Sequence, residues 1–529
     1  MKKMIFLALL GLLAGWTTSC VDDESSMGNA DAGTIVIEGM DEEATLEVNS
    51  YVGTNLKDVV SPKVTSDYPE EDLEYAWYLF EADGSEGYYK DFPIASGLEP
   101  DYEINLPTGL YTVVFEVTCR SNGYVKLATT RLSAATSFAR GYYILKETPD
   151  GQTEVDVYSE SALQSDLMTG MTGAPLLGKP RNLVMFYNGE FINPETNEPD
   201  GGNLVHVMTE DNVYKGFRAE DLCEVFNNDN LFYEGPMPAD EAPATFLRTW
   251  VYCGYISNTG VRYAELGMQL SGPANTGKMG FSEGDGGSRF VVAADGHMGG
   301  YVYWSPTAHK LIRLSYNLDD ASPVEFLDAN DQVVPDAYPS DLECLSAGTN
   351  YLAGSLTSYF LCEQPATGDR CLFLLSSSSK IDRIVKLDPS LHLAKATSFS
   401  ANGWTAAYIY CVDGGKVYAY GLNDGKEREL SLPGIPGGEE VVFVSNQYLN
   451  FEGLADDSYA FDDLIVGTQV GDTYKLYIYG EDQTSTGVPV AEPGDVVTGT
   501  GRVKSVRYMA PVSLDSFMMM MMNPYPMSD

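Results

Sequence analysis

The chain has 529 residues and carries 76 acidic against 32 basic side chains, which gives a formal net charge of −44. So much negative charge argues against a nucleic-acid-binding protein, because phosphate contacts require clustered Lys and Arg. A single hydrophobic core rarely organises a chain of this length, so we expect two or more domains.

Residues 1–19 have the pattern of a secretory signal peptide. Lys2 and Lys3 precede the uncharged run 4–16, MIFLALLGLLAGW, which is shorter than the roughly 20 apolar residues that span a bilayer. Cys20 then follows three small residues, at the position where cleavage would occur. This pattern resembles a bacterial lipoprotein signal, so we expect a membrane lipid anchor at Cys20. The alternative is an ordinary signal peptide with an incidental cysteine.

Residues 20–32 are rich in Asp, Ser, Gly and Ala, which is typical of a flexible acidic tether. Asp22, Asp23 and Glu24 stand almost directly after the cysteine. This arrangement resembles the export signal of Bacteroidetes-type lipoproteins, in which such acids send the protein to the cell surface. It predicts a lipid-anchored protein of the outer membrane that faces the cell exterior. The alternative is a solvated linker without a signal.

Residues 33–137 predict an Ig-like β-sandwich. The segment 73–80, LEYAWYLF, and the segment 111–119, YTVVFEVTC, both alternate apolar and other residues with a period of two. About 100 residues of short strands with Trp77 on one of them are typical of such a sandwich. The two segments together resemble a PKD-like domain.

Residues 140–515 predict a β-propeller, because one sequence pattern recurs along them. The pattern is an apolar strand, a turn rich in Gly, Asp or Asn, and a second strand rich in Tyr and Val. Repeated four-stranded units of 40–50 residues are typical of a propeller, and seven copies predict about seven blades. The alternative is a pair of stacked β-domains. The copies lie at 141–159, 203–217, 289–304, 359–375, 406–422 and 464–480, with a weaker one at 250–266.

Seven cysteines remain beyond Cys20, an odd number that excludes a fully paired disulfide framework within one chain. Cys362 and Cys371 flank the turn-rich stretch EQPATGDR and form the one candidate disulfide, across a hairpin. The chain has no CxxC motif, which argues against zinc knuckles and thioredoxin-like redox sites.

We expect a non-enzymatic protein with no catalytic residues, no metal and no cofactor. None of the four histidines has a metal-binding spacing. Residues 272–279, GPANTGKM, match GxxxxGK but end in Met279 where a P-loop needs Ser or Thr, so we interpret them as a surface loop.

Two acidic loops and the C-terminal tail can each be interpreted either as metal-binding segments or as segments without a ligand. The loop 328–336 offers Asp328, Asn330, Asp331 and Asp336, hard oxygen ligands of the kind calcium takes, but it lacks the EF-hand Gly and Glu. The loop 225–232 is a weaker case. The tail 516–529 contains Met518–Met522; soft metals bind thioethers, but we interpret the run as a disordered or packing segment.

Aromatic residues are the abundant candidates for binding. The chain has 35 Tyr and five Trp, side chains that pair an apolar body with a polar tip and suit sugar or peptide ligands. Trp250, Trp304 and Trp404 lie in the predicted propeller. We interpret most propeller aromatics as packing between blades and expect a few at the mouth of the central channel to meet a ligand.

The whole layout resembles the PKD-like family lipoproteins of Bacteroidetes, on the lipoprotein cysteine, the acidic tether, the PKD-like module and the repeat-rich β-domain described above. Members of that family tend to be associated with SusC/SusD-type outer-membrane uptake systems. The resemblance implies a surface-exposed, non-enzymatic binding or accessory component of nutrient uptake and specifies no ligand. The aromatic residues make a glycan or peptide the candidate ligand. Two alternatives remain open: an extracellular hydrolase or lyase on a propeller scaffold, and a structural scaffold of a transporter complex.

Overall fold

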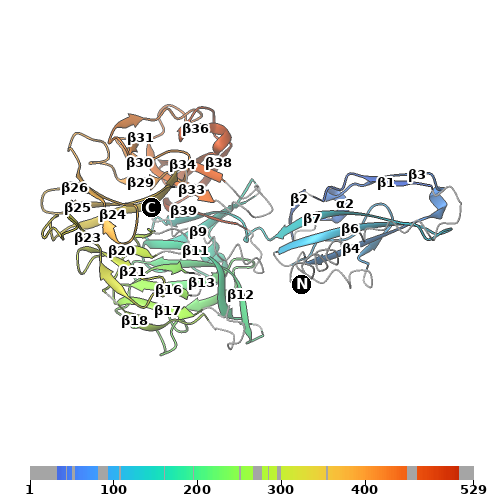
Figure 1. Cartoon of the computed structure of the whole chain (residues 1–529), viewed down its shortest axis with the longest axis horizontal. Coiled ribbons are helices and arrows are strands. Elements are labelled where there is room, and N and C mark those ends of the chain that lie inside the picture. The colour runs from blue at the N-terminus through green and yellow to red at the C-terminus, as the bar shows by residue number, and fades with distance from the viewer. Residues whose placement is uncertain are drawn as a thin grey trace, which may run out of the picture.

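The computed structural model describes residues 33–42, 44–50, 54–81, 93–106, 109–159, 161–194, 196–249, 252–265, 277–283, 285–294, 300–352, 355–449 and 461–510. Nearly all regular structure is β, in two bodies that lie side by side along the long axis of the molecule (Figure 1). No helix in these ranges is long and apolar enough to cross a membrane.

The smaller body is a β-sandwich built from the first seven strands. A five-stranded sheet has the order β2-β7-β6-β4-β5, and the pair β1-β3 packs against it with the short helix α2. The β2–β7 pairing is parallel and the others are antiparallel. The elements are β1 (Ile35–Glu38), β2 (Thr45–Asn49), α2 (Leu56–Val59), β3 (Lys63–Ser66), η2 (Glu70–Asp72), β4 (Leu73–Glu81), β5 (Ala95–Ser96), β6 (Gly109–Cys119) and β7 (Val125–Ala135).

Trp77 on β4 is the centre of the sandwich core. Its side chain is fully buried, with its ring centroid 4.4 Å from that of Phe115 on β6. Its indole Nε1 donates to the backbone oxygen of Gly97 at 2.9 Å, so the one polar atom of the ring is satisfied. The alternation seen in the sequence places Val113, Phe115 and Val117 on this buried face.

The larger body is a seven-bladed propeller: seven four-stranded antiparallel sheets occur in the described residues. Blade 2 is β11-β12-β13-β14, and blades 3 to 7 follow as β15-β16-β17-β18, β19-β20-β21-β22, β24-β25-β26-β28, β29-β30-β31-β32 and β33-β34-β35-β38. The all-β prediction, with a sandwich followed by about seven blades, is thus confirmed.

Blade 1 combines the two ends of the propeller sequence. Its strand order is β10-β9-β8-β39, so the last described strand pairs with the first strand of the propeller. The register runs from Arg502 opposite Glu147 to Met509 opposite Gly141. The ring is closed by this antiparallel pairing.

The propeller elements have the following bounds: β8 (Gly141–Glu147), β9 (Thr153–Ser159), β10 (Ala162–Gln164), α3 (Leu167–Thr172), β11 (Pro180–Ile192), β12 (Pro199–Thr209), β13 (Tyr214–Arg218), β14 (Glu224–Asn227), β15 (Pro243–Arg248), β16 (Tyr252–Ser257), β17 (Gly260–Glu265), β18 (Gly280–Glu283), β19 (Val291–Ala293), β20 (Tyr301–Ser305), β21 (Lys310–Leu314), β22 (Ala321–Pro323), β23 (Glu325–Phe326), β24 (Glu343–Leu352), β25 (Ser355–Gln364), β26 (Asp369–Leu375), β27 (Lys380–Ile381), β28 (Arg383–Lys386), β29 (Ser398–Ala401), β30 (Tyr408–Asp413), β31 (Lys416–Gly421), β32 (Glu427–Glu429), β33 (Val441–Leu449), β34 (Phe461–Val470), β35 (Thr473–Tyr479), η5 (Glu481–Gln483), β36 (Thr484–Ser485), β37 (Val488–Pro489), β38 (Asp495–Thr500) and β39 (Arg502–Met509).

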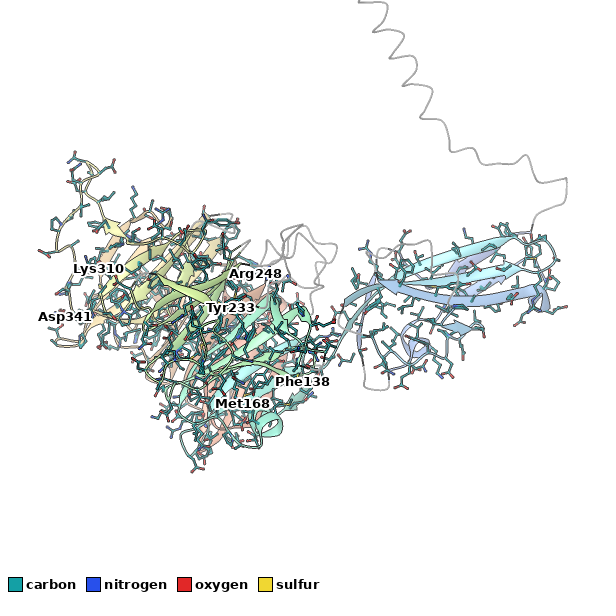
Figure 2. All side chains as sticks on the ribbon, turned by 90° about the horizontal axis from the view of Figure 1, so that it is seen from below. Phe138, Met168, Tyr233, Arg248, Lys310 and Asp341 are labelled. Atoms are coloured by element: carbon teal, nitrogen blue, oxygen red, sulfur yellow. The ribbon has the colours of Figure 1, made fainter. Side chains whose placement is uncertain are left out.

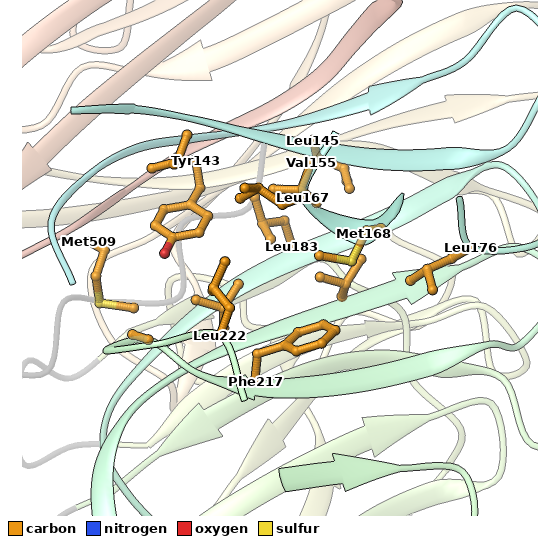
Figure 3. Packing of buried hydrophobic residues seen from close by; sticks show 14 of the residues in the cluster. Tyr143, Leu145, Val155, Leu167, Met168, Leu176, Leu183, Phe217, Leu222 and Met509 are labelled. Atoms are coloured by element: carbon orange, nitrogen blue, oxygen red, sulfur yellow. The ribbon is translucent and has the colours of Figure 1, made fainter. Parts of the chain in front are cut away.

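Each pair of neighbouring blades shares one hydrophobic core. The cluster between blades 1 and 2, for example, joins Tyr143 and Leu145 of β8 to Leu183 of β11 and Phe217 of β13 (Figure 3). Equivalent clusters fill the other six junctions, including the one between blades 7 and 1. Both faces of every blade are therefore buried. This explains why the blade strands are continuous apolar runs and do not alternate between apolar and polar residues.

The segment 136–140 connects the sandwich to the propeller and is anchored on both sides. Arg140 donates from Nη1 to Glu47 Oε2 at 2.5 Å and from Nη2 to the Val48 backbone oxygen at 3.0 Å, both in the sandwich. Thr136 Oγ1 donates to the Glu220 backbone oxygen of the propeller at 2.5 Å. Phe138 lies where the propeller meets this connection (Figure 2). Two bodies joined in this way are expected to keep a defined relative orientation.

We predict that Trp77→Ala destabilises the sandwich by about 3–5 kcal/mol, because the substitution leaves a cavity in a fully buried site. Calorimetric unfolding should show a separate, early sandwich transition and an unchanged propeller transition. Val36→Ala is the control, because Val36 is 47% exposed on β1. Equal unfolding temperatures for wild type and Trp77→Ala would contradict this account of the core.

Candidate functional site

Side-chain amides link the innermost strands of the blades around the propeller axis. Asn350 at the end of β24 donates from Nδ2 to the backbone oxygens of Asn402 and Ala406 at 2.8 and 2.7 Å. The Gly403 N–H donates to Asn446 Oδ1 of β33 at 2.6 Å. Innermost strands have a free edge, and these bridges satisfy its backbone groups. The buried polar residues at this end therefore stabilise the ring.

Asp462, at the start of β34, shapes the turn that follows β29. Its Oδ1 accepts a hydrogen bond from the N–H of Gly403 at 3.2 Å, and its Oδ2 accepts from those of Trp404 and Thr405 at 3.0 and 2.9 Å. This turn presents Trp404 as a partly exposed ring. Trp404 donates from Nε1 to Glu481 Oε1 at 3.0 Å, and so its orientation is fixed.

Asp463, the next residue, has a carboxyl group with a strongly raised pKa. It lies in the junction between blades 7 and 1 and accepts a hydrogen bond from the hydroxyl of Tyr142 on β8. Burial raises the pKa of Asp463 to about 7, and the negative charges of Asp462, Glu481 and Asp495 act in the same direction. Near neutral pH this carboxyl group is part protonated, so it can both donate and accept hydrogen bonds.

Aromatic rings lie on both sides of blade 7 at the start of β34, one group beside Asp463 toward blade 1 and the pair Trp404–Tyr448 beside Asp462 toward blade 6. Tyr142 meets Tyr508 of β39 edge to face at 4.9 Å between centroids, and Phe461 meets the same ring at 4.6 Å. Trp404 meets Tyr448 edge to face at 5.6 Å. We call this group the seam rim and take it as the candidate binding site; it consists of Tyr142, Trp404, Tyr448, Phe461, Asp463 and Tyr508.

The part of the seam rim around Asp463 belongs to a larger set of contacts between blades 7 and 1. Tyr474 of β35 donates to Asp156 Oδ2 of β9 at 2.7 Å, and Tyr158 of β9 donates to Asp495 Oδ1 of β38 at 2.7 Å. With the Tyr142–Asp463 contact, three tyrosine hydroxyls thus meet three aspartates across one junction. The buried Asp156 also pairs with Lys146 Nζ at 2.6 Å. These partners lie more than 300 residues apart, and no local sequence signal could have identified them.

Several residues singled out in the sequence lie outside the described ranges. They are Cys20, Asp22, Asp23, Glu24, Trp250, His297, residues 272–276 and the methionine run Met518–Met522. Gly277 and Met279 are described, and Met279 is buried in the core between blades 2 and 3 rather than in a surface loop. The expectation that residues 272–279 form a surface loop is therefore wrong at its C-terminal end.

The described histidines and tryptophans have structural surroundings. His206 is buried against Phe246 with ring centroids 4.0 Å apart, and burial lowers the pKa of His206 to about 3. His309 Nδ1 is 2.8 Å from the Leu342 backbone oxygen, and His392 Nδ1 is 2.7 Å from Asp413 Oδ2. Trp304 is buried in the core between blades 4 and 5. Trp404 alone of the described propeller tryptophans reaches the candidate site.

The two acidic loops use their side chains for turns. Asp328 Oδ1 accepts from the N–H groups of Asn330 and Gln332 at 2.8 and 3.0 Å, which lowers the pKa of Asp328. In the loop 225–232, Asn230 Oδ1 accepts from the Asn227 N–H at 2.7 Å. Within the described part of the chain, no three His, Cys, Asp or Glu side chains come together in a way that could hold a metal ion.

Cys362 and Cys371, the candidate disulfide, stand directly opposite each other on β25 and β26, and both thiols are free in this structure. The hairpin that the sequence predicted between them is present. Their oxidation remains a prediction.

Comparison with known families identifies a match in the N-terminal part of the chain. Residues 20–180 match the model of the PKD-like family. The match begins at Cys20, covers the sandwich and ends where blade 2 begins. No curated protein matches the sequence.

Solved structures resemble the chain only distantly. A quinonprotein alcohol dehydrogenase-like protein from Bacteroides thetaiotaomicron is 12% identical, with 91% of this chain and 100% of that chain covered and a TM-score of 0.38. AztD from Citrobacter koseri is 12% identical, with coverages of 82% and 100% and a TM-score of 0.34. TM-scores this low support no conclusion about function. The propeller assignment follows from the order of the strands in the seven sheets.

We predict that Asp463→Asn removes a pH-dependent part of the stability. The folded-state pKa of Asp463 is raised to about 7, so its contribution is fully present below the unfolded pKa near 4 and is lost as the pH rises to 7. One such proton changes the free energy of unfolding by at most about 1.4 kcal/mol per pH unit in that window. The asparagine stays neutral and keeps an acceptor for Tyr142.

Thermal unfolding of both proteins between pH 4 and 8 measures this effect. The wild type should lose more stability than Asp463→Asn between pH 4 and 7, and the two curves should run parallel above pH 8. Parallel curves over the whole range would contradict the buried setting of this carboxyl group.

Proposed function

We propose that this chain is a surface-exposed, lipid-anchored binding or accessory protein of the outer membrane, in which the sandwich is a spacer and the propeller carries the binding surface. Cys20 would carry the lipid, and Asp22, Asp23 and Glu24 would direct export to the cell surface. The proposed partner is a SusC/SusD-type uptake system, and the proposed ligand is a glycan or peptide.

The position of the two ends of the sandwich is the observation that carries this proposal. The first described residue, Gly33, accepts a hydrogen bond from Tyr68, whose ring lies 6.5 Å from that of Tyr124 in the β6–β7 turn. From that turn the 11 residues of β7 run to Ala135, next to the propeller. At about 3.3 Å per residue the strand spans about 35 Å. A tether that joins at Gly33 would therefore hold the propeller away from the membrane (Figure 1).

The setting of the buried carboxylates supports a binding role rather than catalysis. Glu154 accepts from the N–H groups of Met168 and Thr169 at 3.0 Å each, at the start of α3. Asp156 pairs with Lys146, and Asp462 orders the turn before β30. Acids committed to such contacts stabilise the fold, and the seam rim offers aromatic faces with a polar carboxyl group, as suits a sugar or peptide.

The anchor is tested by localisation in the native host. We predict that Cys20→Ala moves the protein from the membrane fraction to the soluble fraction, because the anchor depends on the cysteine thiol. The triple substitution Asp22→Ala, Asp23→Ala, Glu24→Ala should leave the protein in the membrane but remove it from the reach of a protease added to intact cells. Membrane retention of Cys20→Ala, or unchanged surface digestion of the triple variant, would contradict the proposal.

The partner is tested by gentle solubilisation of the outer membrane and capture through a C-terminal tag. Recovery of a SusC/SusD-type pair would support the accessory role. Recovery of the protein alone would contradict both the accessory role and the role of a transporter scaffold.

A second candidate function, an extracellular hydrolase or lyase, is favoured by one observation. Asp463 has a pKa of about 7 and lies among partly exposed rings, and shifted carboxyl groups cluster at catalytic sites. An enzyme of this kind would cleave glycans or peptides in the wild type and lose that activity in Asp463→Asn. A binder would show no turnover in either protein.

A further inference from the structure

Three cysteines lie side by side across blade 5. Cys344 on β24 stands opposite Cys362 on β25, and Cys362 stands opposite Cys371 on β26. All three contribute to the core between blades 4 and 5, so their side chains share one face of the sheet. All three thiols are free in this structure.

The spacing of strands decides which of these cysteines can be joined. Residues directly opposite in an antiparallel pair have Cα atoms about 4.5–5.5 Å apart, within the range of about 4.4–6.8 Å that a disulfide needs. Cys344 and Cys371 are two strands apart, about 9.5 Å, which is too far. The central Cys362 is therefore a member of either possible pair.

We propose that Cys344, Cys362 and Cys371 form a redox-active triad with two mutually exclusive cross-strand disulfides, Cys344–Cys362 and Cys362–Cys371. The hairpin disulfide expected from the sequence is one of the two states.

The burial of the three residues sets the order of reaction. Cys362 is fully buried and Cys371 is 8% exposed, whereas Cys344 is partly exposed and is the point of entry for an oxidant. Burial, together with the nearby Cys344, raises the pKa of the Cys362 thiol well above its usual value, and burial raises the pKa of Cys371 to about 12. The two inner residues are thus protonated at neutral pH and react after Cys344.

The oxidant is a small-molecule disulfide such as oxidised glutathione. The Cys344 thiolate attacks one of its sulfurs, the S–S bond breaks, and one small thiolate leaves. Cys362 then loses its proton to solvent, and its sulfur attacks that of Cys344 and releases the second small thiol. Two cysteines are oxidised and one small disulfide is reduced to two thiols.

Movement of the disulfide within the triad needs no further oxidant. Deprotonated Cys371 attacks the sulfur of Cys362, the Cys362–Cys371 bond forms, and the Cys344 thiolate is released and takes up a proton. One S–S bond breaks as another forms. The oxidised triad therefore contains one disulfide at a time and one free thiol.

Peptide mapping of the full chain tests this proposal. The protein is incubated with oxidised glutathione, quenched with acid, alkylated in denaturant and digested with trypsin and chymotrypsin. Cleavage after Arg370 and after Tyr351 separates the three cysteines onto different peptides. The wild type should go from three alkylated triad cysteines to one.

Single substitutions identify the shared residue. Cys371→Ala should yield only the Cys344–Cys362 link, and Cys362→Ala neither link. Cys344→Ala, which lacks the point of entry, should yield only the Cys362–Cys371 link, and more slowly than the wild type oxidises. Cys411→Ala is the matched control, because Cys411 is an equally buried cysteine in blade 6, outside the triad. It should oxidise as the wild type does.

A Cys344–Cys371 link in Cys362→Ala would overturn the proposal, as would three free thiols in every oxidised protein that retains its β circular dichroism spectrum. If Cys362→Ala does not fold, the other two single variants still decide, because each must form its own link and only that link.

Discussion

The closure of the propeller ring depends on one strand pairing. β39, the last strand of the described chain, supplies the innermost strand of blade 1 and pairs with β8. Without it, the β8–β10 sheet would lack its inner strand, and the apolar faces of blades 2 and 7 that meet blade 1 would lose partners such as Val506 and Met509. The junctions among blades 2 to 7 join segments that are neighbours in the sequence, whereas β39 meets β8 and β11 across more than 300 positions.

The chemistry of the closing junction differs from a purely apolar contact. Three tyrosine hydroxyls donate to Asp156, Asp463 and Asp495 across it, and Lys146 neutralises the buried Asp156. Truncating one partner of such a buried ion pair usually costs about 3–5 kcal/mol. The same junction carries four of the six seam-rim residues, Tyr142, Phe461, Asp463 and Tyr508, so the proposed binding surface and the ring closure adjoin.

The sequence predicts the repeating parts of this protein well. Alternation in residues 73–80 and 111–119 identifies β4 and β6, and the recurring strand–turn–strand pattern identifies the blades, because both signals are local. Trp404 and Asp463 acquire their roles only through contacts with η5 and β8, which the ring brings close, so no pattern in their own segments marks them.

The three cysteines of blade 5 also show that the sequence predicts local contacts and misses those set by strand register. The turn-rich stretch between Cys362 and Cys371 predicts their hairpin, since the two residues lie close in the sequence. Cys344 joins them through the register of β24 on β25, which contains a bulge between Cys344 and Ser346. A bulge shifts every later pair by one residue, and its position cannot be read from the sequence alone.

Native-state hydrogen exchange of the wild-type protein tests the central claim about ring closure most directly. The account predicts that the slowest amides of β8 and β39 exchange with the same free energy as those of blades 3 to 5, because the closing junction opens only when the propeller unfolds. Exchange of the β39 amides at a much lower free energy, with blades 3 to 5 still protected, would show that the ring stands without its closing strand and would contradict the account.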